Sequence, residues 1–287
     1  MLGMNDKVVV ITGANRGVGF VAARELAAAG ACIVMVCRDE RRGEAARAAI
    51  AEVATGRPPE LLLADLSVQE DVHAVAEEIR GRHERLDVLL NNAGAVFSKR
   101  ELTADGIERT FATNHLGPFL LTKLVLDLVT AAPAGRVVTV ATEVYAKRLR
   151  LDNLQGEDRY QFFKAYQHSK LCNVLFAFEL ARRLEGTPAT SNVVSPGPTR
   201  TGFGEELTGA GKAFTTVMKR LPVFGPPERG ARTLVYAAAD PALDGVSGRF
   251  FFKSRELETR PVTHDLQAAA TLWAICEDLT GLVTAHV

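Results

Sequence analysis

The chain has 287 residues, of which 47% are hydrophobic and 24% are charged, and its 34 basic side chains balance its 34 acidic ones. A balanced charge and a pI near 7.0 argue against a nucleic acid or an anionic membrane as partner, because both require a basic surface. No apolar run approaches the ~18 residues of a membrane span, and the first residues lack the pattern of a secretory signal. We therefore expect a cytoplasmic protein without an integral membrane segment.

Cysteine and histidine residues are few and irregularly spaced. The four cysteines form no Cys-x-x-Cys pair, and the six histidines form no pair with zinc-ligand spacing. This pattern predicts reduced thiols, mostly buried, and no metal site. Catalysis would then need an organic cofactor or side chains alone.

Apolar strand patterns alternate with helical patterns along the chain. Helical spacing follows at 19–30, 41–54, 67 onward, 114–130, 163–184 and 228–240, and strands are predicted at 7–12, 32–37, 60–66, 86–94, 135–142, 190–197 and 248–252. Repeated strand-helix units specify a parallel sheet with right-handed crossovers and helices on both faces. Without a linker or repeat, residues 1–287 are predicted to form a single domain.

Two places interrupt this regularity. Pro118 should bend the helix through 114–130 or mark a boundary between two helical pieces. The glycine-rich stretch 202–225 has weak periodicity and follows the carboxyl end of a predicted strand. Ligands bind beyond those ends in such sheets, so this stretch is a candidate lid over a substrate.

The stretch TGANRGVG, 12–19, lies between the first strand and the first helix. Gly13, Gly17 and Gly19 allow a tight turn and a close approach of the backbone to a pyrophosphate, and the helix amino end supplies N–H donors. Glycine turns are common, but this strand-turn-helix context indicates a dinucleotide site.

Arg38 stands at the end of the second strand, where a reader of a ribose 2′-hydroxyl would be Asp or Glu. A guanidinium at this point can pair with a 2′-phosphate, and Arg16 in the glycine turn could form the other jaw. The pattern favours NADP(H) over NAD(H). The alternative is two solvated arginines, with Asp39 serving a ribose.

The stretch YQHSK places Tyr166 and Lys170 four residues apart on one helix face. A neighbouring ammonium favours the phenolate, and so brings the tyrosine pKa down from ~10 towards the range of an acid-base catalyst. By itself this spacing is usually ordinary helix surface.

Five stretches occur together in one order: TGANRGVG, NNAG at 91–94, NHLG at 114–117, YQHSK, and SPGPTRT at 195–201. This set resembles the short-chain dehydrogenase/reductase family, over roughly residues 5 to 255. CRD, NHLGPFLLT, DNLQGE and YQHSKLCNVLFAFELARRL are most similar to its retinol-dehydrogenase-like branch. The resemblance implies a Rossmann-type, doubly wound sheet of seven parallel strands in the order 3-2-1-4-5-6-7.

The resemblance also implies roles for individual residues. Tyr166 would be the general acid-base, Lys170 would hold the nicotinamide ribose and lower the tyrosine pKa, and Asn114 would support a proton-relay water. Singly, each position has an ordinary alternative such as a helix cap, a strand exit or a turn. The implied cofactor contacts are Gly13, Asn15, Arg16, Gly17, Val18 and Gly19 at the turn, Arg38 at the 2′ position, Asp65 and Leu66 at the adenine, Asn92, Ala93 and Gly94 at the adenosine ribose, and Pro196, Thr199 and Thr201 at the carboxamide and pyrophosphate.

The chain departs from the branch at the end of the fifth strand. Where Val-Ser-Ser is usual, it has Val140-Ala141-Thr142. Thr142 keeps one O–H donor, so it could still polarise a substrate oxygen, while its methyl group narrows the pocket and its stiff χ1 fixes the hydroxyl. The alternative is a β-branched residue that merely ends a strand.

The resulting expectation is an NADPH-dependent carbonyl reductase, or alcohol dehydrogenase in reverse, for a bulky apolar or polycyclic small molecule. Two alternatives stay open: redox-neutral chemistry such as epimerisation or dehydration, and a non-catalytic NADP(H)-binding protein. The helices at 106–130 and 163–184 are as compatible with a homodimer face as with core packing. Candidate pocket walls, which could equally be core, are Phe97, Val144, Tyr145, Phe203 and Phe214.

Overall fold

The computed structural model describes residues 3–199, 204–218 and 220–282. Within them, one eight-stranded sheet has the order β3-β2-β1-β4-β5-β6-β7-β8. The predicted order of seven parallel strands is confirmed, and a short antiparallel strand that the sequence pattern did not reveal is added at the edge. The strands are β1 (Val8–Thr12), β2 (Cys32–Cys37), β3 (Glu60–Leu63), β4 (Val88–Asn91), β5 (Arg136–Val140), β6 (Thr190–Ser195), β7 (Phe250–Phe252) and β8 (Arg255–Glu256).

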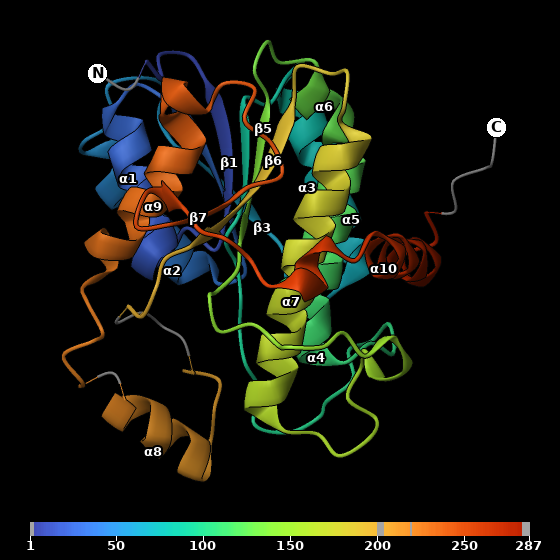
Figure 1. The fold of residues 1–287 in the computed structure, drawn as a ribbon. Helices are drawn as coiled ribbons and strands as arrows, with labels where there is room; N and C mark the ends of the chain where they lie inside the picture. Colours follow the sequence, from blue (N-terminus) through green and yellow to red (C-terminus); the bar gives the residue numbers. More distant parts are fainter. Residues whose placement is uncertain (1–2, 200–203, 219, 283–287) are drawn as a thin grey trace.

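Helices cover both faces of the sheet (Figure 1). On one face lie α1 (Gly17–Ala28), α2 (Glu40–Ala51) and α9 (Pro227–Ala239). The other face carries α3 (Gln69–Arg82), α5 (Gly117–Leu124) and α7 (Phe162–Arg183), with α10 (Leu266–Leu279) packed on α7. Shorter helices are α4 (Arg109–Phe111), α6 (Leu126–Thr130) and α8 (Gly209–Met218). Because α10 covers part of α7, core packing already explains that much of its apolar surface, and a dimer face stays a prediction.

The central strand β1 shows why the sheet is buried on both faces. Successive side chains of a strand point to opposite faces. Val8 and Val10 accordingly join the core beneath α3 and α5, whereas Val9 and Ile11 join the core beneath α1 and α9. Because both faces of β1 are buried, successive residues of this strand should be apolar, and the sequence accordingly shows an uninterrupted apolar run from Val8 to Ile11.

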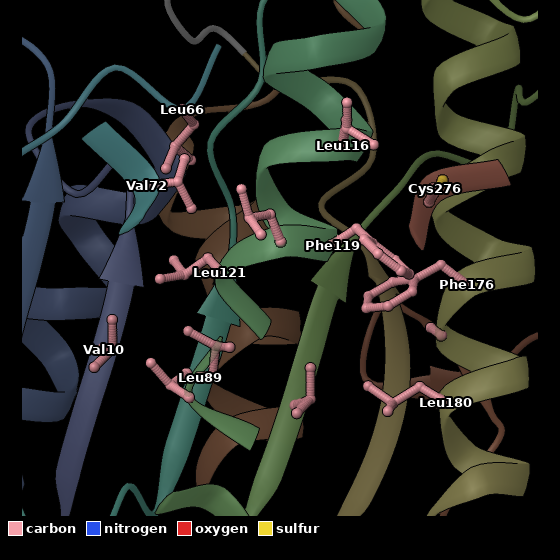
Figure 2. Close-up of a cluster of buried hydrophobic side chains, with 14 of the residues drawn as sticks. Val10, Leu66, Val72, Leu89, Leu116, Phe119, Leu121, Phe176, Leu180 and Cys276 are labelled. Atoms are coloured by element: carbon pink, nitrogen blue, oxygen red, sulfur yellow. The ribbon is translucent and has the colours of Figure 1, made fainter. Parts of the chain in front are cut away.

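The larger core lies between the sheet and the layer of α5, α7 and α10 (Figure 2). Phe119 of α5 and Phe176 of α7 pack edge to face, with ring centroids 5.6 Å apart, and Trp273 of α10 contacts both rings. This packing ties the carboxyl-terminal helix to α7, the helix that carries the predicted Tyr-Lys pair.

The interruption predicted at Pro118 is confirmed. A π-helical turn, Ala112–Leu116, separates α4 from α5, and Pro118 lies in the first turn of α5. Proline is tolerated there because the first N–H groups of a helix have no partner within the helix. The π-turn contains Asn114, so the irregularity lies at a predicted site residue.

Further expectations concern thiols, metals and membranes. All four cysteines are buried and unpaired. No cluster that could hold a metal ion occurs among the described residues. Over the same part of the chain, none of the helices has both the length and the apolar character needed to cross a bilayer.

Candidate active site

The glycine turn has the backbone geometry that a dinucleotide site requires. Gly13 and Gly17 have φ of +67° and +58°, values that disfavour any residue with a Cβ. A Cβ on Gly19 would meet the Asn92 amide nitrogen at 2.3 Å and the Gly13 carbonyl oxygen at 2.6 Å. The turn is thus as tight as predicted, and it packs closely against Asn92 at the end of β4.

Asn92 holds this turn in place. Its side-chain nitrogen donates to the carbonyl oxygens of Thr12 and Gly13, at 2.8 and 3.2 Å. The Thr12 hydroxyl in turn accepts from the backbone N–H groups of Asn92 and Ala93, both at 3.0 Å. The side chain of Asn92 therefore positions the turn, a more specific role than the ribose lining implied by the resemblance.

The amino end of α1 has no side-chain cap, unlike those of α2 and α10. Asp39 caps α2 through the Arg42 N–H, and Asp265 caps α10. Arg16 stands at the N-cap of α1 and its side chain makes no cap hydrogen bond. Backbone donors at this end can therefore serve an anionic ligand. Asp39 uses one carboxylate oxygen for its cap and also lines the cavity, so the alternative in which it serves a ribose stays open.

Arg38 lies beside Asp65 and a second carboxylate. Its guanidinium is 3.5 Å from the Asp65 carboxylate and donates to Glu206 at 2.7 Å. Asp65 also accepts from the N–H and hydroxyl of Ser67, at 2.9 and 2.7 Å. The expected phosphate reader is thus in place at the end of β2, although it is already engaged by acidic side chains.

Tyr166 and Lys170 face the same space from the first half of α7. The Lys170 Nζ lies 5.8 Å from the centroid of the Tyr166 ring and donates to the Val140 carbonyl oxygen at 3.0 Å. Burial lowers the pKa of Lys170 to about 8. Burial, followed by the negative charge of Glu143, raises the pKa of Tyr166. The expected lowering of the tyrosine pKa is therefore not found here: burial raises it, and the Lys170 ammonium is turned towards Val140.

Asn114 is fully buried behind the lysine rather than exposed to the cavity. Its amide oxygen accepts from the Ala95 N–H at 2.7 Å, and its nitrogen donates to the Ala95 carbonyl and the Ser169 hydroxyl, at 2.9 and 3.0 Å. A Cβ on Gly94 would lie 3.4 Å from Lys170 Nζ and 3.5 Å from Asn114 Oδ1. The structure thus brings Asn114 and Lys170 together, as the resemblance implied, and it also places beside them Gly94, which the resemblance had assigned to the adenosine ribose.

Thr142 lies two residues beyond β5 and lines the cavity. Its hydroxyl oxygen accepts from the Val144 N–H at 3.3 Å, which leaves its own O–H to donate. The next residue, Glu143, also lines the cavity and accepts a 2.5 Å hydrogen bond from the Ser195 hydroxyl. The Glu143 carboxylate therefore lies beside Thr142, the predicted donor to the substrate oxygen, and its charge contributes, after burial, to the raised pKa of Tyr166.

One cavity of about 910 Å³ joins these parts, from the glycine turn and Arg38 to Thr142 and Tyr166. Asn114 lies behind its wall, and Thr201 is outside the described residues. The other predicted site residues that line it are Gly13, Asn15, Arg16, Gly17, Val18, Gly19, Asp65, Leu66, Asn92, Ala93, Gly94, Lys170, Pro196 and Thr199.

Comparison with known proteins decides the family. The family model described as short chain dehydrogenase matches residues 7–210. The chain belongs to the short chain dehydrogenase family. Retinol dehydrogenase 14 of Mus musculus is 39% identical over 294 residues, covering 98% of this chain and 87% of the relative. Retinol dehydrogenase 12 of Homo sapiens is 36% identical, with 96% and 87% covered. Polyprenol dehydrogenase of Mus musculus is 39% identical, with 96% and 84% covered.

Solved structures of other proteins share the fold. An uncharacterized protein from Mycobacterium paratuberculosis superposes with a TM-score of 0.77 at 35% identity, covering 96% of this chain and 94% of that one. A short chain dehydrogenase from Shigella flexneri 2a, crystallised with NADP, has a TM-score of 0.68 at 24% identity, with 88% and 99% covered. The second likeness supports the fold alone.

The walls of this short-chain dehydrogenase cavity differ from those expected. Val144 lines the cavity, but Phe97 and Tyr145 are core residues, 3% and 4% exposed. The Tyr145 hydroxyl accepts from the Arg260 N–H at 3.0 Å, which turns it away from the site. Phe203 and the side chain of Phe214 lie outside the described residues.

Several site residues escaped the sequence analysis. Phe162 and Phe163 line the cavity one helical turn before Tyr166, and Phe163 stacks on the Tyr166 ring with centroids 6.4 Å apart. Their spacing on α7 was a usable signal. Of the predicted lid, Glu206, Thr215, Val223 and Phe224 line the cavity, whereas closure of 202–225 stays a prediction. Arg42 also lines the cavity, and only the tertiary structure shows that Glu206 lies beside Arg38.

Proposed function

We propose that this short-chain dehydrogenase transfers hydride between NADP(H) and a bulky, apolar alcohol or carbonyl compound. The observation that carries the cofactor assignment is the cluster of Arg16, Arg38 and Arg42 around one wall of the cavity. Guanidinium groups are the donors best suited to a phosphate, and NADP(H) differs from NAD(H) by a phosphate at this position.

The residues present fit such a cofactor from end to end. The glycine turn and the amino end of α1 would hold the pyrophosphate, because this helix end has no side-chain cap and the three glycines line the cavity. Lys170, with Gly94 beside it, would hold the nicotinamide ribose. When bound, the nicotinamide supplies or accepts the hydride.

The protein's own residues would handle the oxygen of the substrate. Tyr166 and Thr142 line the same end of the cavity and each can donate an O–H to a carbonyl oxygen. During reduction Tyr166 gives its proton to that oxygen, and during oxidation it accepts the proton back. The positive charge of Lys170 favours the phenolate that is formed.

An apolar substrate is supported by the walls near Tyr166. Val144, Phe162, Phe163, Val223 and Phe224 line this part of the cavity. Exposed apolar side chains are costly in water unless a ligand covers them, and Phe163 and Val223 are 44% and 55% exposed. The relatives named retinol dehydrogenase and polyprenol dehydrogenase point to the same class of alcohol.

The test is reduction of retinal and other long apolar aldehydes and ketones by the purified protein with NADPH or NADH. We expect NADPH consumption matched by alcohol formation, and a Tyr166→Phe variant that binds NADPH but reduces at least ~10²-fold more slowly. Product formed without NADPH consumption would instead establish redox-neutral chemistry. Tight NADPH binding without turnover of any carbonyl compound would establish a non-catalytic binding protein.

A further inference from the structure

Two glutamates contact all three arginines of the proposed phosphate site. Glu205 pairs with Arg16 and lies 3.4 Å from the guanidinium of Arg42. Glu206 accepts from Arg38 at 2.7 Å. Glu205 lies 189 residues after Arg16 in the sequence, and Glu206 lies 168 residues after Arg38. Only the tertiary fold therefore creates this cluster.

The segment that carries these glutamates is anchored on its carboxyl-terminal side. Leu207 directly after them is buried, with 1% of its surface exposed. The Thr208 N–H donates to the Ser98 hydroxyl at 2.8 Å. Glu205 and Glu206 are therefore held beside the arginines by packing and a hydrogen bond as well as by charge.

A carboxylate and a phosphate use the same donors of a guanidinium group. The carboxylate is planar and the phosphate is tetrahedral, but the oxygen atoms of either anion can accept hydrogen bonds from the parallel N–H groups of a guanidinium. A 2′-phosphate at Arg38 would meet donors that Glu206 already occupies and would lie close to the negative charge of both glutamates. Like charges at that separation repel one another.

We propose, on the basis of the NADP(H) assignment above, that Glu205 and Glu206 are specificity-determining residues of the cofactor site. They compete with the 2′-phosphate for Arg16, Arg38 and Arg42, and so reduce the preference for NADP(H) over NAD(H). NAD(H) carries a hydroxyl at this position, which leaves the arginine-glutamate pairs intact and can donate to a carboxylate.

Because the cluster is exposed to solvent, the two glutamates weaken binding of the 2′-phosphate but do not prevent it. The side chains of Arg16, Arg38, Glu205 and Glu206 are 36%, 46%, 47% and 32% exposed. Ion pairs so close to water are weak and salt-sensitive. A phosphate, with up to two negative charges and three acceptor oxygens, therefore displaces them at a moderate cost.

The experiment measures Kd for NADPH and NADH on the full chain carrying Glu205→Gln and Glu206→Gln together. We expect NADPH to bind about tenfold more tightly and NADH to change by less than about twofold, because only the phosphate competes. The gain should shrink in ~1 M NaCl, which screens exposed charges. When Arg38 is already replaced by alanine, Glu206→Gln should change the Kd for NADPH little, because the effect of Glu206 depends on its pairing with Arg38.

The matched control is Glu52→Gln with Glu185→Gln, which removes the same two charges at exposed positions after the carboxyl ends of α2 and α7. It should leave both Kd values unchanged. If the control tightens NADPH as much as the test variant, net charge explains the result and the proposal is wrong. An unchanged ratio of NADPH to NADH affinity in the test variant also overturns it. Failure of the wild-type chain to bind either nucleotide would overturn the proposed function itself.

Discussion

The ammonium group of Lys170 donates a 3.0 Å hydrogen bond to the main-chain carbonyl of Val140, the last residue of β5. The same carbonyl accepts from the Asn173 side chain at 3.3 Å. One backbone oxygen, two residues before Thr142, therefore links the lysine of α7 to the strand that presents the substrate-oxygen donor.

Lys170 should make stability depend on pH in the protein without added nucleotide. Burial lowers its folded pKa to about 8 from 10.5 in the unfolded chain. Below pH 8 the lysine is charged in both states and burial of that charge destabilises the fold. Between pH 8 and 10.5 the unfolded state binds more protons, so this contribution improves as pH rises, by roughly 3 kcal/mol in all.

Urea unfolding across this pH range, for wild type and Lys170→Met, isolates that contribution. Buried thiols change stability in the opposite direction, since burial raises the pKa of Cys37 to about 11, but they are present in both proteins. The difference between wild type and variant should therefore vary between pH 8 and 10.5. A difference that is flat with pH would show that the pKa of Lys170 is not lowered in the folded protein, and hence that the ammonium is not buried in solution.

Thr142 should contribute through its hydroxyl. Thr142→Ser keeps the O–H donor and should retain most of the activity. Thr142→Ala should reduce kcat on the order of 10²-fold, as for loss of an oxyanion donor, with little change in the Kd for NADPH. An alanine variant as active as wild type would make Thr142 a residue that merely ends the strand.

Glu143 should set the pH dependence of alcohol oxidation. Burial and, after it, the negative charge of Glu143 raise the pKa of Tyr166, so Glu143→Gln should move the acidic limb of the pH-rate profile to lower pH. Ser195→Ala is the control, because it removes the 2.5 Å hydrogen bond to Glu143 but keeps the charge. A shift in the control as large as that of Glu143→Gln would indicate a structural effect instead.

Asn173 should position the catalytic lysine. Its nitrogen donates to Val140, so its oxygen accepts from Nδ1–H of His115, at 3.0 Å, and the His115 Nε2 remains to accept from the Cys276 thiol at 3.4 Å. Burial lowers the pKa of His115 to about 4, which keeps the ring neutral as this chain of bonds requires.

Asn173→Ala should therefore destabilise the fold by about 1–3 kcal/mol, the cost of unpaired buried groups, and should also lower kcat at temperatures where the variant is folded. Asn192→Ala is the matched control, because Asn192 is a buried amide with two backbone partners, Val246 and Arg249. It should lose similar stability but keep kcat. Equal losses of kcat in both variants would reduce Asn173 to a packing role.

The sequence by itself predicted the parallel sheet, the glycine turn and the Tyr166-Lys170 pair, while the strand order followed from the resemblance of its motifs to the short-chain dehydrogenase/reductase family. The first three features depend on local patterns: apolar runs such as 7–12, glycines where a Cβ has no room, and side chains one helical turn apart. Their positions along the chain are enough to predict which edge of the sheet holds the site.

Only the tertiary structure decided what surrounds those residues. Tyr145 was an aromatic near the site in sequence, yet it packs into the core because Arg260 binds its hydroxyl. Glu143 meets Ser195 because β5 and β6 are neighbours, and Glu206 reaches Arg38 across 168 residues. Electrostatics and burial act through space and not along the chain, so the raised pKa of Tyr166 and the occupied arginine cluster could be seen only in the folded protein.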